Sequence, residues 1–181
     1  AQNYINKNNQ LTGNILKYGW DKDHFIYGIN DWRERVGSYD EKEAQLFLNP
    51  QTWAVIAGIA PDESALLDLV EDKMKCDYGY VQCIPSYSSP NPHVGRISYF
   101  GKGLFENGAV YNHGCAFKMV ADCIAGRGDN AYETFKLMSP YNPKNLYTHS
   151  GVEPYSMTNM YLGPECELRA GEITSSWTTG T

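Results

Sequence analysis

Residues 104–138, LFENGAVYNHGCAFKMVADCIAGRGDNAYETFKLM, decide the fold that we predict for this chain. The apolar positions in the middle of the stretch recur at helical spacing, which predicts a helix with a broad buried face. A Gly-Arg-Gly-Asp turn at 126–129 ends it, and the residues that follow predict a second helix with Asp129 as its N-cap. The stretch therefore predicts a helical hairpin whose entrance carries a carboxylate, Glu106, and an imidazole, His113. For His113 alone, a helix-start histidine that hydrogen-bonds locally is an equally open interpretation.

Further elements are predicted on both sides of this hairpin. They are a strand at 24–29 with a returning arm at 35–38, a helix at 51–60 capped by Asn49, a helix at 65–75, a long ordered loop at 78–100 and a helix from Val152 to Leu162. Pairs of helices thus alternate with long polar loops, and strands are few. Such pairs can stack side by side with the loops at one end, where we expect the function to lie.

Composition limits the classes of function. The chain has 181 residues, enough for one domain, and its net charge of -6 without a basic run argues against nucleic acid or an anionic membrane as partner. No signal peptide and no membrane-spanning apolar run is visible. Five cysteines without a Cys-x-x-Cys pair predict free thiols in a reducing, cytoplasmic setting and no metal site. Because the chain opens on Ala1 and ends at Thr181 within a segment that reads as structured, we expect a piece of a longer polypeptide.

Several polar residues lie where loops meet predicted helices. They are Glu106, Asn107, Asn112, His113, Glu153, Thr178, Thr179 and Gly180. The glycine of Thr-Thr-Gly-Thr lets a backbone amide approach an oxyanion, and the hydroxyls add donors, so this segment and a histidine could form a small anion site. An ordinary turn has the same composition.

A second candidate is the sequence Asp31-Trp32-Arg33-Glu34, which has two acids beside an aromatic residue. A glycosidase can use such a pair. The tip of a hairpin looks much the same, and we favour the hairpin tip.

The motifs in their order resemble the glycoside hydrolase family 94 phosphorylases, which act on β-linked disaccharides such as cellobiose and chitobiose. Related modules occur in cyclic β-1,2-glucan synthases. The segments that carry the resemblance are Gly19-Trp20-Asp21, Phe25-Ile26-Tyr27-Gly28, residues 46–55 (LFLNPQTWAV), Gly95-Arg96-Ile97, Glu106-Asn107-Gly108, Tyr111-Asn112-His113, residues 126–129 (GRGD), Glu153-Pro154-Tyr155 and residues 176–181 (SWTTGT). They extend from about Trp20 to the end of the chain.

The resemblance implies a fold and a set of site residues. The fold is all-α: the C-terminal portion of an (α/α)6 barrel with a small β-hairpin and long loops, so that 1–181 form a partial catalytic domain lacking its N-terminal part and last helix. The family's phosphate site falls on His113, Thr179 and Gly180, and its sugar-site glutamate falls on Glu106. Inorganic phosphate is a co-substrate, and neither a metal nor an organic cofactor is expected.

The implied activity is that of a glycosyltransferase-type disaccharide phosphorylase: inverting phosphorolysis of a β-linked disaccharide to a sugar 1-phosphate and a free sugar. The family's general acid and a phosphate-site arginine are expected upstream, so no catalytic residue is assigned, residues 31–34 are a decoy, and the chain alone is expected to be inactive. The expected partners are the disaccharide, phosphate and the remainder of the polypeptide, with a homodimer left open. The alternatives are an inverting hydrolase of the same barrel class, with Glu106 or Glu153 as second carboxylate, and a non-catalytic carbohydrate-binding fragment.

Overall fold

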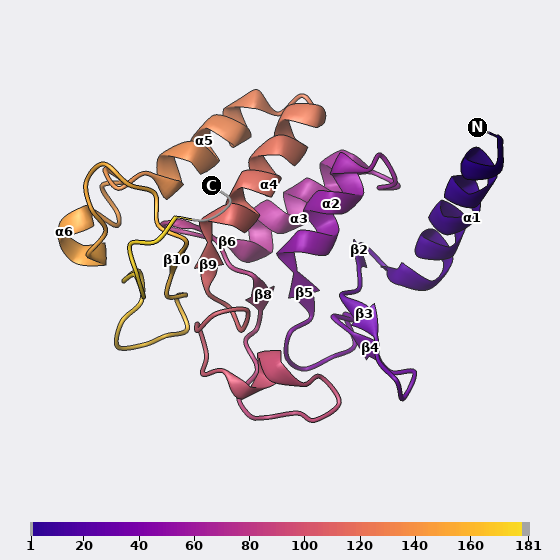
Figure 1. Ribbon diagram of the computed structural model, residues 1–181, viewed down its shortest axis with the longest axis horizontal. Helices are drawn as coiled ribbons and strands as arrows, with labels where there is room; N and C mark the ends of the chain where they lie inside the picture. The colour runs from indigo at the N-terminus through magenta and orange to yellow at the C-terminus, as the bar shows by residue number, and fades with distance from the viewer. Residues whose placement is uncertain (1, 179–181) are drawn as a thin grey trace.

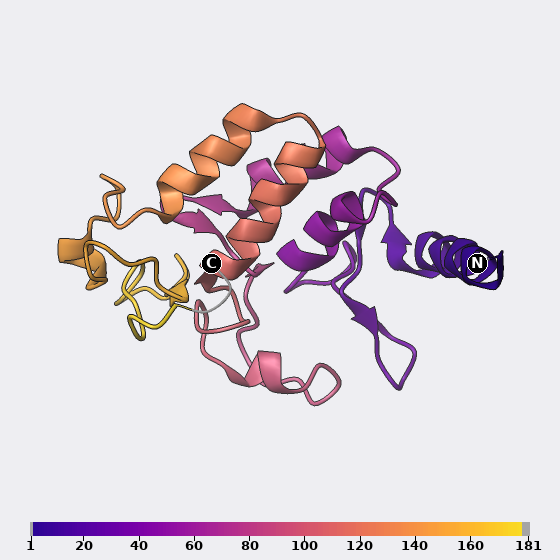
Figure 2. The same cartoon turned by 45° about the horizontal axis from the view of Figure 1, so that its top comes forward.

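Six α-helices make up most of the regular structure in the computed structural model, which describes residues 2–178 (Figure 1). The helices are α1 (Gln2–Gly19), α2 (Leu48–Ile56), α3 (Glu63–Met74), α4 (Asn112–Ile124), α5 (Gly128–Met138) and α6 (Tyr147–Ser150), and a 3-10 helix, η1, spans Arg96–Tyr99. Figures 1 and 2 both show α2 to α5 packed together, with most of the long loops on one side of them. The predicted helix-rich class is confirmed, whereas the portion of an (α/α)6 barrel stays a prediction.

Short strands fasten the loops to one another. Within the described residues, ten strands of two residues pair into five antiparallel sheets: β1 (Trp20–Asp21) with β2 (His24–Phe25), β3 (Gly28–Ile29) with β4 (Arg35–Val36), β5 (Leu46–Phe47) with β8 (Cys83–Ile84), β6 (Lys75–Cys76) with β7 (Gly79–Tyr80), and β9 (Val110–Tyr111) with β10 (Met160–Tyr161). The predicted hairpin near residues 24–38 is confirmed as β3 and β4. The β5–β8 and β9–β10 pairs join segments that are distant in sequence, so they fix where α2 and α4 begin.

The helices α4 and α5 form the predicted helical hairpin. Gly126 follows α4 with a φ of 73°, a left-handed backbone conformation that favours glycine and ends the helix. The prediction that Asp129 caps α5 is wrong, because the N-cap is Arg127, whose side chain makes no capping hydrogen bond. Asp129 lies in the first turn instead, where a negative charge is favourable.

The start of α2 also differs from the prediction. The helix begins at Leu48 after the extended residue Phe47, which makes no side-chain cap. Asn49 is therefore inside the first turn, beside Pro50, and its side chain is not the cap that the sequence predicts. The next helix, α3, has a side-chain cap in Asp62, whose carboxylate accepts from the amide of Ala65 at 2.9 Å.

Two apolar clusters hold these helices together. One joins Val70 of α3, Cys115 of α4 and Met138 of α5, and the other joins Val55 of α2 and Leu67 of α3 with the middle of α4. All five side chains are buried. Complete burial of a Val, Leu or Met side chain stabilises a fold by about 1.5–3 kcal/mol.

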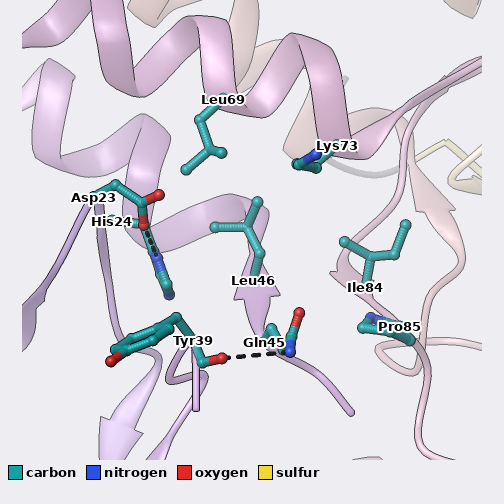
Figure 3. A pocket seen from close by; sticks show the side chains of 9 residues that line it. All are labelled: Asp23, His24, Tyr39, Gln45, Leu46, Leu69, Lys73, Ile84 and Pro85. Carbon is teal, nitrogen blue, oxygen red and sulfur yellow. Dashed lines mark hydrogen bonds and ion pairs between the residues drawn. The ribbon is translucent and has the colours of Figure 1, made fainter. Parts of the chain in front are cut away.

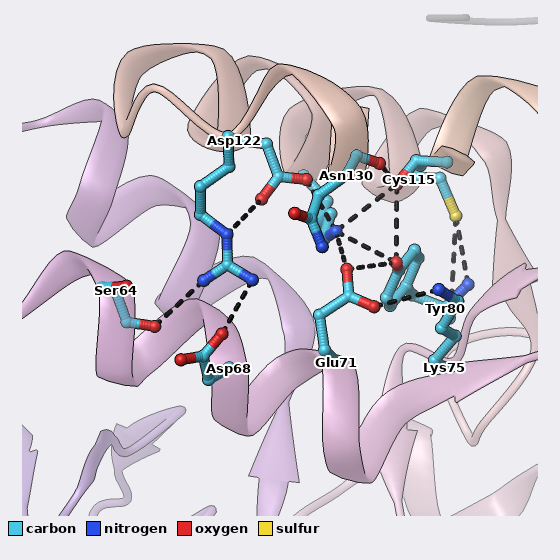
Figure 4. A network of polar contacts seen from close by, with 11 residues as sticks. Ser64, Asp68, Glu71, Lys75, Tyr80, Cys115, Asp122 and Asn130 are labelled. Atoms are coloured by element: carbon cyan, nitrogen blue, oxygen red, sulfur yellow. Dashed lines mark hydrogen bonds and ion pairs between the residues drawn. The ribbon is translucent and has the colours of Figure 1, made fainter. Parts of the chain in front are cut away.

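A buried charge network also joins α3, α4 and α5 (Figure 4). Lys118 of α4 is fully buried, forms ion pairs with Glu71 and with Asp122 (2.6 Å), and donates to the Tyr80 hydroxyl at 3.0 Å. Burial raises the pKa of Asp122. Burial would also raise the pKa of Glu71, but hydrogen bonds from Lys118 and Tyr80 hold it at about 2. Lys118 therefore fixes the position of α4 relative to α3.

Residues 152–162 do not form the predicted helix. Their regular part is strand β10, in which Met160 lies opposite Tyr111 and Tyr161 opposite Val110. The apolar spacing of so short a run fits a helix and a strand about equally. Pairing with β9, fifty residues earlier, decides between them, so the helix prediction is wrong for a reason that local spacing cannot reveal.

The segment at 78–100 is ordered, as predicted, and Asn107 is what holds it. This buried side chain donates to the carbonyls of Phe100 (2.7 Å) and Tyr87 (3.0 Å) and accepts from the amide of Tyr87 (2.7 Å). An amide whose donors and acceptor are all hydrogen-bonded to the backbone has a structural role, and we call this contact the Asn107 clamp. Asn107 is therefore not the ligand residue that its place beside Glu106 suggests.

The first helix, α1, extends away from the other helices in both views (Figures 1 and 2). None of its residues is buried. Within the described part of the chain, no helix combines the length and apolarity that crossing a membrane requires.

Candidate functional site

The candidate site lies at the start of α4, which three neighbouring segments position. The amide of Asn112 donates to the carbonyl of Asn159 (3.0 Å), and the amide of Asn159 donates to the carbonyl of Trp177 (2.7 Å). Thr158 adds a bond from its hydroxyl to the carbonyl of Ser175 at 2.6 Å. The Ser-Trp part of the C-terminal motif is thereby held beside the first turn of α4. The predicted phosphate residues Thr179 and Gly180 lie outside the described residues.

His113 lies in this first turn and is half-buried. Its ring packs on Phe117 at 4.6 Å between centroids, and Phe117 in turn packs on Trp53 at 5.0 Å. Among residues 2–178 its ring nitrogens have no hydrogen-bond partner, so the structure does not show the local bonding that the alternative interpretation requires. Ring packing orients the imidazole and leaves both nitrogens available for a ligand.

Glu106 is exposed at the tip of the turn that precedes β9. It lines a small cavity of about 60 Å³, which Asn49 and Gln82 also line. Burial and, to a smaller extent, the Glu106 carboxylate raise the pKa of Tyr111, while Arg96 lowers it, and the result is a pKa of about 12. Glu106 and Arg96 are thus both electrostatic neighbours of Tyr111 in β9.

The remaining polar candidates near the C-terminus are not joined to this group. The Glu153 side chain is half-buried, and its Oε2 has no hydrogen-bond partner within the described residues. Thr178 is exposed. No hydrogen bond or ion pair in the described structure connects either residue to Glu106 or His113.

The acid pair at 31–34 lies at the tip of the β3–β4 hairpin, which confirms the favoured interpretation. Trp32 stacks on His93 at 4.2 Å between centroids, and Glu34 contacts the same imidazole at 2.8 Å. Hydrogen bonds from Asn30 and then His93 lower the pKa of Glu34. Glu34 therefore stays ionised and does not suit the role of a general acid.

A larger cavity of about 370 Å³ lies between α3 and the β5–β8 strands (Figure 3). His24 on its wall is buried, and its ring nitrogens contact the Asp23 carboxylate (2.9 Å) and the Gly37 carbonyl (3.0 Å). Both nitrogens are thus used by the fold. Lys73 and Gln45 also line the cavity, but it lies apart from the residues at the start of α4.

The described structure contains no assembled metal site and no reactive thiol site. No group of three or more His, Cys, Asp or Glu side chains within residues 2–178 is arranged to hold a metal ion. All five cysteines are free thiols. Burial is the first cause that raises the pKa values of Cys76, Cys83 and Cys115, each to about 12, so these thiols stay protonated.

The helix-rich fold, with an imidazole and a carboxylate near the start of one helix, defines a class: a helical domain with a polar candidate site where its loops meet. The match over residues 1–181 is to the family described as "Glycosyl hydrolase 94 superfamily, catalytic domain", and the chain belongs to that family. The resemblance stated from the sequence motifs is thereby confirmed.

Individual relatives have disaccharide phosphorylase names. The chain is 46% identical over 165 residues to a solabiose phosphorylase of Paenibacillus borealis, covering 90% of this chain and 21% of the relative. It is 37% identical over 173 residues to a 3-O-beta-D-glucopyranosyl-beta-D-glucuronide phosphorylase of the same organism, covering 95% and 22%. It is 28% identical over 185 residues to an N,N'-diacetylchitobiose phosphorylase of Vibrio proteolyticus, covering 98% and 23%. The chain spans about a fifth of the length of these relatives.

Proposed function

We propose that this chain supplies phosphate and sugar contacts to a site for inverting phosphorolysis of a β-linked disaccharide. The products are a sugar 1-phosphate and a free sugar. Membership of the family and the phosphorylase names of the relatives support this proposal. The remainder of the polypeptide would complete the site and the (α/α)6 barrel.

The observation that carries the proposal is the state of His113. Its ring nitrogens have no hydrogen-bond partner among residues 2–178, and it lies in the first turn of a 13-residue helix. Helix N-termini favour anions, because unpaired amides and the helix dipole both face the ligand. The segment held beside this turn continues directly into Thr179 and Gly180. We therefore assign phosphate to His113, Thr179 and Gly180 together.

The chemistry requires little from this chain beyond binding. A phosphate oxygen attacks the anomeric carbon, the glycosidic C–O bond breaks, and a protonated carboxyl gives its proton to the departing sugar oxygen. Phosphate is already an anion, so the second carboxylate that an inverting hydrolase uses to activate water is dispensable. We assign the general acid to the remainder of the polypeptide, and we assign Glu106 to a sugar hydroxyl.

Replacement of His113 tests the proposal in the full-length polypeptide that carries this sequence. Solabiose, cellobiose and N,N'-diacetylchitobiose are the substrates to screen, with and without inorganic phosphate. For His113→Ala we expect phosphate-dependent turnover to fall by roughly 10²- to 10³-fold, the loss typical of removing one group that stabilises an anion.

The matched control is His149→Ala. His149 is exposed, and its Nε2 lies 3.2 Å from the carbonyl of Ala170. Its replacement should leave turnover unchanged. Equal turnover in His113→Ala and wild type would remove His113 from the site, and free sugar released without phosphate would favour the hydrolase.

A further inference from the structure

Two amide side chains beside the candidate site have buried atoms without a hydrogen-bond partner in the described structure. Asn49 Oδ1, an acceptor, and Gln82 Nε2, a donor, are shielded from solvent and have no partner among residues 2–178. Gln82 as a whole is 9% exposed. Because an unpaired buried polar group destabilises a fold, such atoms in a native protein call for an explanation, and a ligand is one.

The backbone fixes where these two side chains lie. The amide of Gln82 donates to the carbonyl of Ala109 (2.9 Å), and its carbonyl accepts from the amide of Leu48 (3.0 Å). Gln82 is therefore held between the segment that enters α2 and the segment that enters α4. Asn49, in the first turn of α2, faces the same place.

Gly114 shows how close this place is to His113. A Cβ on Gly114 would overlap Gln82 Nε2 and would lie 3.3 Å from Asn49 Oδ1. Both unused atoms thus approach the first turn of α4 at the residue directly after His113. A side chain at this position would require the end of the Gln82 side chain to shift.

The small cavity that Asn49 and Gln82 line suits a small polar group. Its volume is about 60 Å³, enough for a hydroxyl or hydroxymethyl group and too small for a whole sugar ring. Tyr27 and Phe47, stacked at 4.3 Å between centroids, form part of the wall, and the Glu106 carboxylate also lines it. Apolar walls with a few fixed polar groups are typical of small-molecule sites.

The polar groups indicate which ligand chemistry fits. Asn49 Oδ1 and the Glu106 carboxylate are acceptors, whereas Gln82 Nε2 is a donor. A phosphate oxygen would face two acceptors, while a sugar hydroxyl can donate to them and accept from Gln82. We propose that Asn49 and Gln82, with Glu106, bind one hydroxyl-bearing arm of the disaccharide, next to the phosphate contact at His113. This assignment rests on the proposed function.

The test uses the full-length polypeptide and a series of monodeoxy analogues of its disaccharide. Formation of sugar 1-phosphate by the wild type is established first, since its failure would overturn the proposed function and not the amide assignment. The wild type should then turn over one deoxy analogue with kcat/KM reduced by roughly 10²-fold or more, because that analogue leaves the site's polar groups unpaired. Gln82→Met should lose a similar factor with the intact sugar and should not discriminate against that analogue. Its KM for phosphate should stay within about twofold of wild type.

Gln51→Met is the matched control. Gln51 is fully buried, and its amide is bonded to both the amide and the carbonyl of Phe25 and to the carbonyl of Phe47. Gln51→Met should lower Tm and keep the discrimination between intact and deoxy sugar. Gln82→Met should keep or raise Tm, because it removes an unpaired donor.

Two results would overturn the assignment. One is that Gln82→Met still discriminates between the intact and the deoxy sugar as the wild type does. The other is that Gln82→Met lowers Tm as Gln51→Met does and lowers kcat/KM equally for both sugars, which is the result expected if the cavity holds only water. If Gln82→Met does not fold, Asn49→Ala takes its place. Loss of discrimination in Asn49→Ala supports the assignment, and full discrimination contradicts it.

Discussion

Replacing Lys118 by Met removes the cation at the centre of the buried charge network. The Lys118 side chain is 0% exposed, contacts the carboxylates of Glu71 and Asp122, and donates to the Tyr80 hydroxyl. In its absence Glu71 keeps Lys75 at 3.1 Å and the Tyr80 hydroxyl at 2.6 Å. The Asp122 side chain is also 0% exposed, and its remaining cationic neighbour is the Arg127 guanidinium, at the longer distance of 3.6 Å.

The expected loss of stability follows because Glu71 keeps close partners after the substitution and Asp122 does not. Breaking a buried ion pair by removing one partner costs about 3–5 kcal/mol, because a charge stays buried without compensation. Asp122 is in that position after Lys118→Met, and burial already raises its pKa in the intact network. A cost of this size corresponds to roughly 2 × 10²- to 5 × 10³-fold easier opening of α4.

Hydrogen–deuterium exchange of the full-length polypeptide measures this opening locally. Under conditions where exchange reports the opening equilibrium, amides of α4 and α5 should exchange faster in Lys118→Met by the factor above. Lys136→Met is the control, since Lys136 pairs with Glu133 on an exposed face of α5 and its loss should leave exchange unchanged.

A second variant separates charge from packing. Replacing Lys118 together with Glu71 and Asp122 by apolar residues of similar volume should restore much of the protection, because no fully buried charge stays unpaired. Exchange of α4 at the wild-type rate in Lys118→Met would refute the reasoning.

Three further predictions concern residues with defined contacts. The pKa of Glu71 is about 2 in the fold, against an ordinary value of 4.5, so the ionised carboxylate stabilises the fold fully above pH 4.5 and this stabilisation is lost as the pH falls toward 2. Glu71→Gln should therefore flatten the dependence of Tm on pH in that range. Asn107→Ala removes the clamp on the loop at 78–100 and should cost roughly 1–3 kcal/mol locally, seen as faster proteolysis of that loop, and an unchanged cleavage rate would contradict the clamp. Phe117→Leu loosens the ring packing of His113 and should raise the KM for phosphate roughly 2- to 10-fold with little change in kcat, whereas Phe117→Tyr should behave like wild type.

The central hairpin could be predicted from sequence because its signals are local. Apolar residues at helical spacing, and a glycine where the chain reverses, lie within one stretch. The buried pair Lys118 and Asp122 could not be foreseen, since charged residues four apart are ordinarily a solvated helix face. Their burial depends on Glu71, which another helix presents.

Other errors have the same physical origin. Residues 152–162 are extended because Met160 and Tyr161 pair with β9, and nothing within the segment records that partner. Asn107 resembles a ligand residue in sequence, yet its side chain exchanges hydrogen bonds with the backbone of Tyr87, twenty residues earlier. Hydrogen bonds between distant segments thus decided both outcomes.

The candidate site was foreseen in part. His113 and Glu106 came from family motifs, and the structure leaves the ring nitrogens of His113 uncommitted and shows Glu106 lining a cavity nearby. Asn49 and Gln82 were missed, because neither lies in a pattern that marks ligand contacts, and Asn49 looked like a helix cap. A buried unpaired atom is a property of three-dimensional packing, which sequence spacing does not report.

The most direct test of the central claim is the product formed by the full-length polypeptide from a β-linked disaccharide and inorganic phosphate, followed by NMR. Phosphorolysis with inversion predicts the α-anomer of a sugar 1-phosphate, formed in equal amount with free sugar and absent when phosphate is withheld. Release of two free sugars at the same rate with and without phosphate would contradict the claim and assign the site to hydrolysis.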